Sequence, residues 1–268
     1  MCPTSDPVGP ALNAAESSCR RKVLVAWIAA LCAVALCAGC TGTVGGTAEP
    51  ARDSAGIIGI GRSIPQILPN SSELTSALRF QVADDGFPPS VGGPELLAPG
   101  REVADQDGAE CVGVTEPFRK APYRNAPVRA VAIQGWHGVE SNHWVDAGVI
   151  ALASPRDAEA LFARFAGQWQ RCQGASVTLR SVKAGVPEYR DDITDVNSVN
   201  GLLTAMVTLS SFYDSVAFPS ERALGVAYNC IIDLNVTDFD FQHGDPATAK
   251  RAETVFDLMA AKAGDSRR

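Results

Sequence analysis

The sequence predicts an α+β fold in which a largely antiparallel β-sheet is flanked by helices. Runs of adjacent strand patterns lie between only a few helix patterns, an order typical of antiparallel sheets rather than of βαβ units. The clearest alternation covers 224–236, where every second residue from Leu224 to Val236 is aliphatic, aromatic or cysteine and is expected to face a core. The chain of 268 residues, 46% of them hydrophobic, is long enough to bury a sizeable core.

The first elements of the folded part are short. A helix is predicted at 71–79, with a serine cap and an early glutamate. Residues 84–108 are interrupted by proline and glycine and are predicted to form a loop. Strands are predicted at 128–134 and 144–153. The second strand carries apolar residues on both parities, which favours a central position buried on both faces.

A long helix is predicted to open at 154–157, with Ser154 as its cap and proline in its first turn. Apolar residues then recur at three- and four-residue spacing and predict one buried face: Leu161, Phe162, Phe165, Trp169 and Cys172. Further strands are predicted at 175–182, 188–195 and 202–209. A final helix is capped at Asp245–Pro246 and runs to about Ala263, and its inward residues are Ala252, Val255, Phe256 and Met259.

The N-terminal segment has the pattern of a secretory signal peptide. A basic cluster at 20–22 precedes the uncharged run 23–38, and small residues lead to Cys40. Leu-Cys-Ala-Gly-Cys resembles a bacterial lipobox, which predicts lipid attachment and cleavage at Cys40. An uncleaved signal anchor is the alternative. A Cys37–Cys40 redox pair is disfavoured because no strand-to-helix context surrounds it.

These features predict the organisation of the chain. Residues 1–39 form a signal peptide, and 40–63 form a lipidated N-terminus with a flexible tether rich in Gly, Ala, Thr and Ser. Residues 64–263 form the folded domain, and 264–268 form a tail. The expected location is the extracytoplasmic face of the cell membrane, to which the chain is attached by its lipid.

Charge and cysteine content limit the partners and the covalent structure. The formal net charge of −7 argues against a nucleic-acid partner, which requires clustered Lys and Arg. Of the eight cysteines, Cys111, Cys172 and Cys230 remain after the signal peptide and Cys40 are set aside. Outside the cytoplasm, three thiols can form one disulfide and leave one cysteine over.

The motifs of common catalytic and metal sites are missing from the sequence. It contains no nucleophile elbow, phosphate-binding glycine loop or zincin helix, so we predict no catalytic residues, no cofactor and no enzyme activity. His137, Glu140 and His143 are spaced like loose metal ligands. Glycines at 135 and 138 favour a turn between two strands instead, so no metal site is predicted.

Four segments carry a resemblance to a known family: Tyr-Arg-Asn-Ala-Pro at 123–127, Gly-Gln-Trp-Gln-Arg-Cys at 167–172, the run 222–234 and the closing helix. Together they resemble the PknH-like extracellular sensor domains, which occur on a mycobacterial serine/threonine kinase and in stand-alone lipoproteins. The similarity covers 64–263. It implies a mixed fold with an antiparallel sheet and a V-shaped cleft for an unidentified ligand.

The resemblance also implies a disulfide between Cys111 and Cys172. The family typically has two bridges. Cys230 matches the last of its cysteines, but the third is missing near Ala184–Gly185, so a second bridge is not expected and Cys230 is predicted to be free.

We therefore predict an envelope lipoprotein whose sensor-like domain binds an envelope ligand and has no kinase activity. The aromatic-rich turn at 136–144 is the candidate ligand-binding segment, through Trp136, His137, His143 and Trp144, because these side chains combine apolar area with a polar tip. Two alternatives stay open. An envelope hydrolase requires a base beside a nucleophile, and a structural or partner-binding lipoprotein requires an exposed apolar patch.

Overall fold

The computed structural model describes residues 64–84, 86–99, 103, 106–180, 187–213, 217–239 and 250–265. All of them belong to one compact unit that spans 51–268. The predicted signal peptide, Cys40 and the tether lie outside the described residues. Within the described ranges, no helix is both long and apolar enough to cross a bilayer.

A single nine-stranded sheet organises the domain, with the strand order β1-β3-β4-β9-β8-β7-β6-β5 and β2 paired to β3. Every pairing between these strands is antiparallel. The strands are β1 (Val82–Asp84), β2 (Ser90–Gly92), β3 (Val128–Gly138), β4 (His143–Leu152), β5 (Ser176–Arg180), β6 (Pro187–Val199), β7 (Leu202–Ser211), β8 (Ala217–Ala227) and β9 (Cys230–Asp238). The predicted α+β class with an antiparallel sheet is confirmed.

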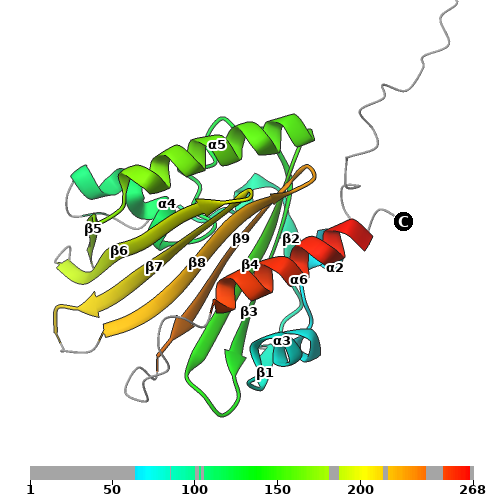
Figure 1. Ribbon diagram of the computed structural model, residues 1–268, viewed down its shortest axis with the longest axis horizontal. Helices are drawn as coiled ribbons and strands as arrows, with labels where there is room; N and C mark the ends of the chain where they lie inside the picture. Colours follow the sequence, from blue (N-terminus) through cyan, green and yellow to red (C-terminus); the bar gives the residue numbers. More distant parts are fainter. Residues whose placement is uncertain are drawn as a thin grey trace, which may run out of the picture. The chain divides into compact units, whose positions relative to one another are not determined.

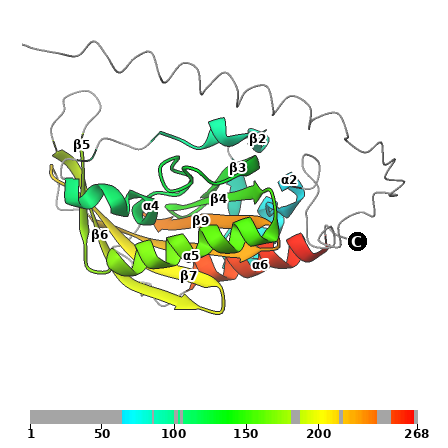
Figure 2. The ribbon, with the colours of Figure 1, turned by 90° about the horizontal axis from the view of Figure 1, so that it is seen from above.

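Helices cover parts of both faces of the sheet. They are α2 (Ile64–Ile67), α3 (Ser71–Leu78), α4 (Val112–Thr115), α5 (Pro155–Arg171) and α6 (Arg251–Asp265), with short 3-10 turns η2 (Pro94–Leu96) and η3 (Gln106–Cys111). One buried cluster joins α2, α3 and α6 to the sheet, and a second joins α4 and α5 to it. Figure 1 shows α6 crossing the middle strands, and Figure 2 shows α2 and α6 at one end of the molecule and α4 and β5 at the other.

The helix starts follow local capping chemistry. Ser154 caps α5 as predicted, because its Oγ accepts the Asp157 N–H. The cap of α3 is Asn70, one residue before the serine that the sequence suggested. The Asn70 side chain accepts the Glu73 N–H, and the Glu73 carboxylate accepts the Asn70 N–H, which makes a capping box. The predicted cap at Asp245–Pro246 lies outside the described residues.

The pattern at 224–236 does not form one strand, which corrects the interpretation of its alternation. Tyr228 and Asn229 form a two-residue turn between β8 and β9, with Tyr228 at φ 59°, and Ala227 pairs with Cys230. Leu224 therefore faces the α5 side of the sheet, whereas Cys230 and the alternate residues after it face the α6 side. Both sheet faces are buried here, so the alternation continues through the turn without revealing it.

Three other predictions from sequence are met. β4 is central and buried on both sides, between β3 and β9. Cys111 and Cys172 form a disulfide with 5.7 Å between their Cα atoms, as the resemblance implies, and it ties the segment before α4 to the end of α5. Cys230 is free and buried, and burial raises its thiol pKa to about 12, so the thiol is unreactive at neutral pH.

Candidate functional site

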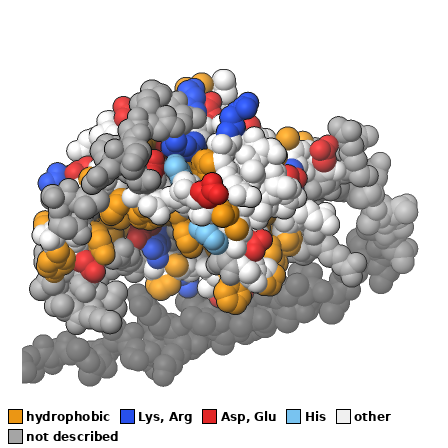
Figure 3. Space-filling view, turned by 90° about the horizontal axis from the view of Figure 1, so that it is seen from below, with side chains coloured by type: hydrophobic (Ala, Val, Ile, Leu, Met, Phe, Trp, Pro, Cys, Tyr) orange, Lys and Arg blue, Asp and Glu red, His pale blue; other side chains and the backbone are white. Residues whose placement is uncertain are grey.

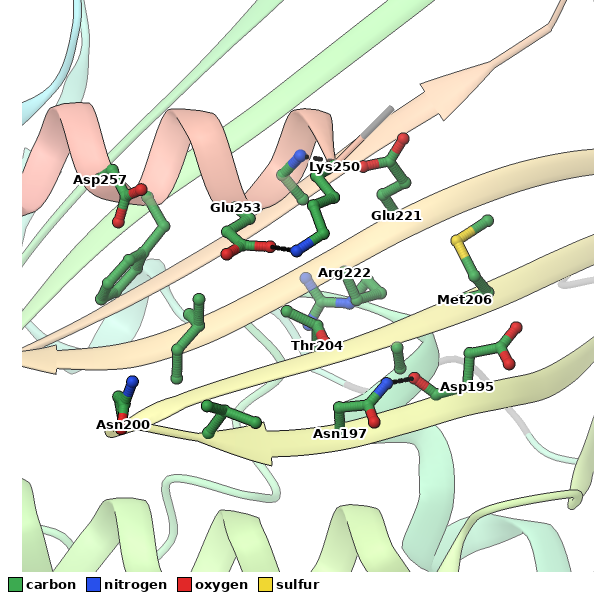
Figure 4. Close-up of a pocket in the computed structure, with 15 residues that line it drawn as sticks. Asp195, Asn197, Asn200, Thr204, Met206, Glu221, Arg222, Lys250, Glu253 and Asp257 are labelled. Carbon is green, nitrogen blue, oxygen red and sulfur yellow. Dashed lines mark hydrogen bonds and ion pairs between the residues drawn. The ribbon is translucent and has the colours of Figure 1, made fainter. Parts of the chain in front are cut away.

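A groove of about 600 Å³ opens where α6 stops covering the sheet. α6 packs on β8 and β9, and beyond it the same face of β7 and β6 carries no helix among the described residues. Leu202, Thr204 and Met206 of β7 stay half-exposed there, while Leu203, Ala205 and Val207 between them are buried on the other face. Figure 4 shows this space, which we call the α6 groove, between the helix and the strands.

Glu221 of β8 fixes the N-terminal end of α6. Its Oε2 accepts the Ala252 N–H at 3.1 Å, and its other oxygen lies 3.8 Å from an Arg251 guanidinium nitrogen. A carboxylate at a helix N-terminus also interacts favourably with the helix dipole. Burial nevertheless raises the pKa of Glu221, because desolvation outweighs these contacts. The start of one groove wall therefore depends on a buried carboxyl group.

Phe256 and Gly225 set how closely α6 approaches the sheet. A Cβ atom at position 225 would lie 2.5 Å from Cε2 and Cζ of the Phe256 ring, so the ring occupies the space that the missing side chain leaves. At the other end of the helix, Lys262 Nζ lies 2.6 Å from Glu73 Oε2 of α3. These contacts hold the wall along the length of α6.

The opposite wall of the groove comes from an irregular part of β6. A bulge between Thr194 and Asn197 shifts the register with β7, and Asp195 takes a positive φ of 52°. The Asn197 side chain donates to the Asp195 carbonyl at 2.8 Å (Figure 4). The bulge thus brings polar side chains to the rim, opposite the apolar Phe256.

The groove has an acidic and mixed polar–apolar lining. Its carboxylates are Asp195, Glu221, Glu253 and Asp257, and its cationic residues are Lys250 and Arg222. Lys250 pairs with Glu253 at 3.1 Å, and the Arg222 side chain is fully buried with its partner Asp233 on the far side of the sheet. Of the described lining residues, none is a serine, cysteine or histidine. The lining suits hydrogen bonding and apolar contact with a neutral or cationic ligand.

A buried ion pair lies on the opposite side of the sheet from the α6 groove and holds the segment that carries the 123–127 motif. Arg222 donates to Asp233 Oδ1 at 2.9 Å and to the Val114 carbonyl at 2.8 Å. Asp233 Oδ2 accepts the Phe118 N–H at 3.1 Å and the Tyr123 hydroxyl at 3.0 Å. Burial, followed by the charge of Asp233, raises the pKa of Tyr123, which therefore stays a donor. This network fixes the α4 segment to β8 and β9.

The four side chains singled out at the 136–144 turn are not brought together. Trp136 is fully buried on the α6 face, and the His143 ring stacks on Phe80 at 4.4 Å on that side. His137 and Trp144, a directly opposed pair with ring centroids 6.3 Å apart, lie on the other face. None of the four lines the α6 groove. Figure 3 shows histidine side chains among hydrophobic ones at this end of the molecule.

The possible metal ligands noted from the sequence at this turn form no metal-binding cluster among the described residues. Within the described ranges, no group of three or more His, Cys, Asp or Glu side chains is arranged to hold a metal ion.

The residues that line the α6 groove were not predicted as site residues from the sequence. Two signals existed: Glu221 is a charged residue in the middle of the strand β8, and Thr204 alternates with buried aliphatic residues.

Comparison with known proteins identifies the family to which this domain belongs. The family model of the PknH-like extracellular domain matches residues 62–262. The chain belongs to this family. Serine/threonine-protein kinase PknH from Mycobacterium bovis is 24% identical over 180 residues, which cover 64% of this chain and 29% of that kinase. PknH from Mycobacterium tuberculosis has the same identity, over 27% of its length. The chain thus spans less than a third of the curated relatives it matches.

A solved structure supports the fold. The crystal structure of the extracellular domain of PknH from Mycobacterium tuberculosis superposes with a TM-score of 0.61 at 20% identity, covering 75% of this chain and 95% of that one. At this identity the likeness concerns the fold of the PknH-like domain alone. The resemblance noted from the sequence is confirmed by the family match and by this structure.

Proposed function

We propose that the chain is a cell-envelope lipoprotein whose PknH-like domain acts as an extracytoplasmic, sensor-like ligand-binding module without kinase activity. Membership of an extracellular domain family supports an extracytoplasmic location. The lipobox-like sequence that ends at Cys40 supports attachment to the membrane through lipid. A diacylated and N-acylated cysteine supplies more than the marginal membrane affinity of a single chain.

The α6 groove is the observation that carries the binding role. Its volume of about 600 Å³ is within the range of about 300–1,000 Å³ common for small-molecule sites. Phe256, Met206 and Leu202 supply apolar area, and Asn197 and Thr204 supply hydrogen-bonding groups. This mixed lining favours an envelope component with both an apolar and a polar part.

A pair of substitutions on one strand tests the groove. Ligands are first sought by thermal shift with cell-wall fragments, glycolipids and small metabolites, since a ligand that prefers the folded state raises Tm. Thr204→Arg places a long cation in the groove and is expected to abolish the shift. Thr208→Arg is the matched control, because Thr208 lies on the same strand and the same face but outside the lining. Equal loss in both variants, or turnover of a bound compound, contradicts the proposal.

The anchor is tested separately by Cys40→Ala. The expected result is loss of lipid labelling and release of the protein from the membrane fraction. A variant that stays as membrane-bound and lipid-labelled as the parent rules out lipidation at Cys40.

A further inference from the structure

A pocket of about 450 Å³ lies between the segments 94–99 and 120–128, and it shares no lining residue with the α6 groove. Leu97, Tyr123 and Val128 connect it to the buried cluster on the α5 side of the sheet. The charged residues of its described lining are Lys120 and Arg124. We therefore call this space the basic pocket.

Backbone and side-chain hydrogen bonds hold both walls of the basic pocket. The Ala98 N–H donates to the Phe118 carbonyl at 2.9 Å, and the Lys120 N–H donates to the Ala98 carbonyl at 2.8 Å, so the two segments are joined beside the pocket. The Tyr123 hydroxyl donates to the buried Asp233 carboxylate at 3.0 Å. The pocket is therefore formed before any ligand arrives, which lowers the entropy cost of binding.

The charge at the basic pocket is opposite in sign to that of the whole protein. The chain has 30 Asp and Glu residues against 23 Lys and Arg residues. The run 117–139 nevertheless contains no Asp or Glu, and its cationic residues are Arg119, Lys120, Arg124 and Arg129. Positive charge is thus concentrated at this pocket of an acidic protein, which favours an anionic ligand here.

The cations of the pocket are not used to stabilise the fold. Lys120 and Arg124 are exposed, and within the described residues neither side chain makes an ion pair or a hydrogen bond. Arg119 of the same run, by contrast, lies 2.6 Å from Glu116. Asn125, which takes a positive φ of 64°, also lines the pocket. The 123–127 motif therefore has two parts: Tyr123 fixes the segment, and Arg124 and Asn125 face the pocket.

The combination of cations and apolar surface defines the class of ligand. A guanidinium group binds phosphate oxygens in a bidentate manner, and an ammonium group binds them as a point charge. A phosphate monoester carries close to two negative charges at neutral pH and can neutralise both cations, whereas a carboxylate carries only one. The rest of the lining is largely apolar and includes Pro94, Leu97 and Val128, which suit a hydrocarbon group beside the phosphate.

We propose that the basic pocket is a second binding site that takes an organic monophosphate, with the phosphate bound by Lys120 and Arg124 and an apolar group packed against Leu97 and Val128. The phosphate can come from a free small molecule or from a lipid headgroup, and the experiment separates these sources. Because the two sites share no lining residue, the test does not depend on the function assigned to the α6 groove.

The test is calorimetry on the full chain purified in a non-ionic detergent. Phenyl phosphate is the probe, and it should bind more tightly than inorganic phosphate, phenol or benzoate, each of which lacks one part of the proposed ligand. Lys120→Gln and Arg124→Gln should each weaken binding of phenyl phosphate about fivefold, the size expected for losing one exposed ion pair. Arg129→Gln is the matched control, because it removes the same charge from an exposed residue of the same run outside the lining. It should bind phenyl phosphate like the parent.

Stability and competition complete the test. Both pocket cations are exposed, so the Tm of Lys120→Gln and Arg124→Gln should equal that of the parent, and a lowered Tm would show a structural role instead. Phosphatidic acid added to the micelles should weaken phenyl phosphate binding more than oleate of equal charge if a lipid headgroup is the ligand, whereas equal effects assign the site to a free phosphate. Absence of phenyl phosphate binding, tighter binding of benzoate, or an equal loss in Arg129→Gln would each overturn the proposal.

Discussion

Gly225→Ala is expected to destabilise the domain and move the wall of the α6 groove. The added Cβ would lie 2.5 Å from two carbon atoms of the Phe256 ring, whereas carbon atoms in contact prefer about 3.5–4.0 Å. Restoring contact distance requires the ring or helix α6 to retreat by about 1 Å. Overpacking of this kind costs about 1–3 kcal/mol. We expect a loss of that size in urea denaturation and weaker binding in the groove.

A double-mutant cycle isolates the contact between the two residues. Phe256 is almost fully buried, so Phe256→Ala alone should cost about 3–5 kcal/mol. In the Phe256→Ala background the clash with the ring is gone, and Gly225→Ala should cost less than about 1 kcal/mol, since alanine suits a strand better than glycine does. The Gly201 carbonyl, 3.0 Å from the added Cβ, is present on both sides of the cycle and cancels.

The cycle also shows how the reasoning would fail. If the two substitutions are additive, the ring does not limit the approach of α6 to the sheet, and the account of the groove wall is wrong. If Gly225→Ala leaves stability unchanged, the helix shifts freely, and the groove has no fixed width.

Three further predictions concern the frame of the site. Arg222→Met should cost about 3–5 kcal/mol in urea denaturation because it leaves a buried Asp233 charge unpaired, and adding Asp233→Asn should recover part of the loss; an unchanged loss in the double variant contradicts this. Glu221→Gln should raise Tm at pH 7. The pKa of Glu221 is raised in the folded state, so at a pH above its usual pKa of 4.5 ionisation of this carboxyl group destabilises the fold. The gain in Tm should shrink as the pH falls below 4.5, and a gain that does not depend on pH would refute this prediction. Joint Cys111→Ala and Cys172→Ala substitution should cost about 4 kcal/mol, from a bridge that closes 61 residues of chain separation, and a loss below 1 kcal/mol would contradict the chain-entropy reasoning.

The fold was predictable to the level of its class and most of its strands, because alternation and capping are local signals. The β8–β9 turn was not. Tyr228 and Asn229 form it without glycine or proline, and both sheet faces are buried on either side, so apolar residues continue at every second position through the turn. Only pairing with neighbouring strands, which a single sequence does not encode locally, separates the two strands.

The candidate turn at 136–144 shows the same limit in another form. Adjacent residues of a strand point to opposite faces, so Trp136 and His137 could not have shared a site once β3 extended to Gly138. The strand was predicted to end at Gln134, and the residues beyond it were treated as one loop cluster. The pairing of His137 with Trp144 then fixed which side chains meet.

The α6 groove could not be predicted from the sequence. It depends on which strands helix α6 packs against, not only on which face of the helix is apolar. Periodicity correctly gave the inward residues of α6, including Phe256. It does not say which strands they cover. That choice is made by Glu221 and Gly225, which lie about 30 residues earlier in the chain and act through a carboxylate at the helix start and a missing side chain below Phe256.

The open spaces on both faces of the sheet follow from how the helices cover it. A helix is only about 10 Å wide with its side chains, so each helix covers a narrow part of a wide sheet: α6 packs mainly on β8 and β9, and α5 contacts β4, β6, β8 and β9. On a nine-stranded sheet, α6 on one face and α5 on the other leave strands uncovered. Beyond α6, strand β7 forms the floor of the α6 groove and β6 forms its opposite wall. Beyond α5 the segments 96–98 and 115–119 cover the sheet, and the buried pair of Arg222 and Asp233 holds these segments in place. Open space on both faces is thus a consequence of covering a wide sheet with few helices.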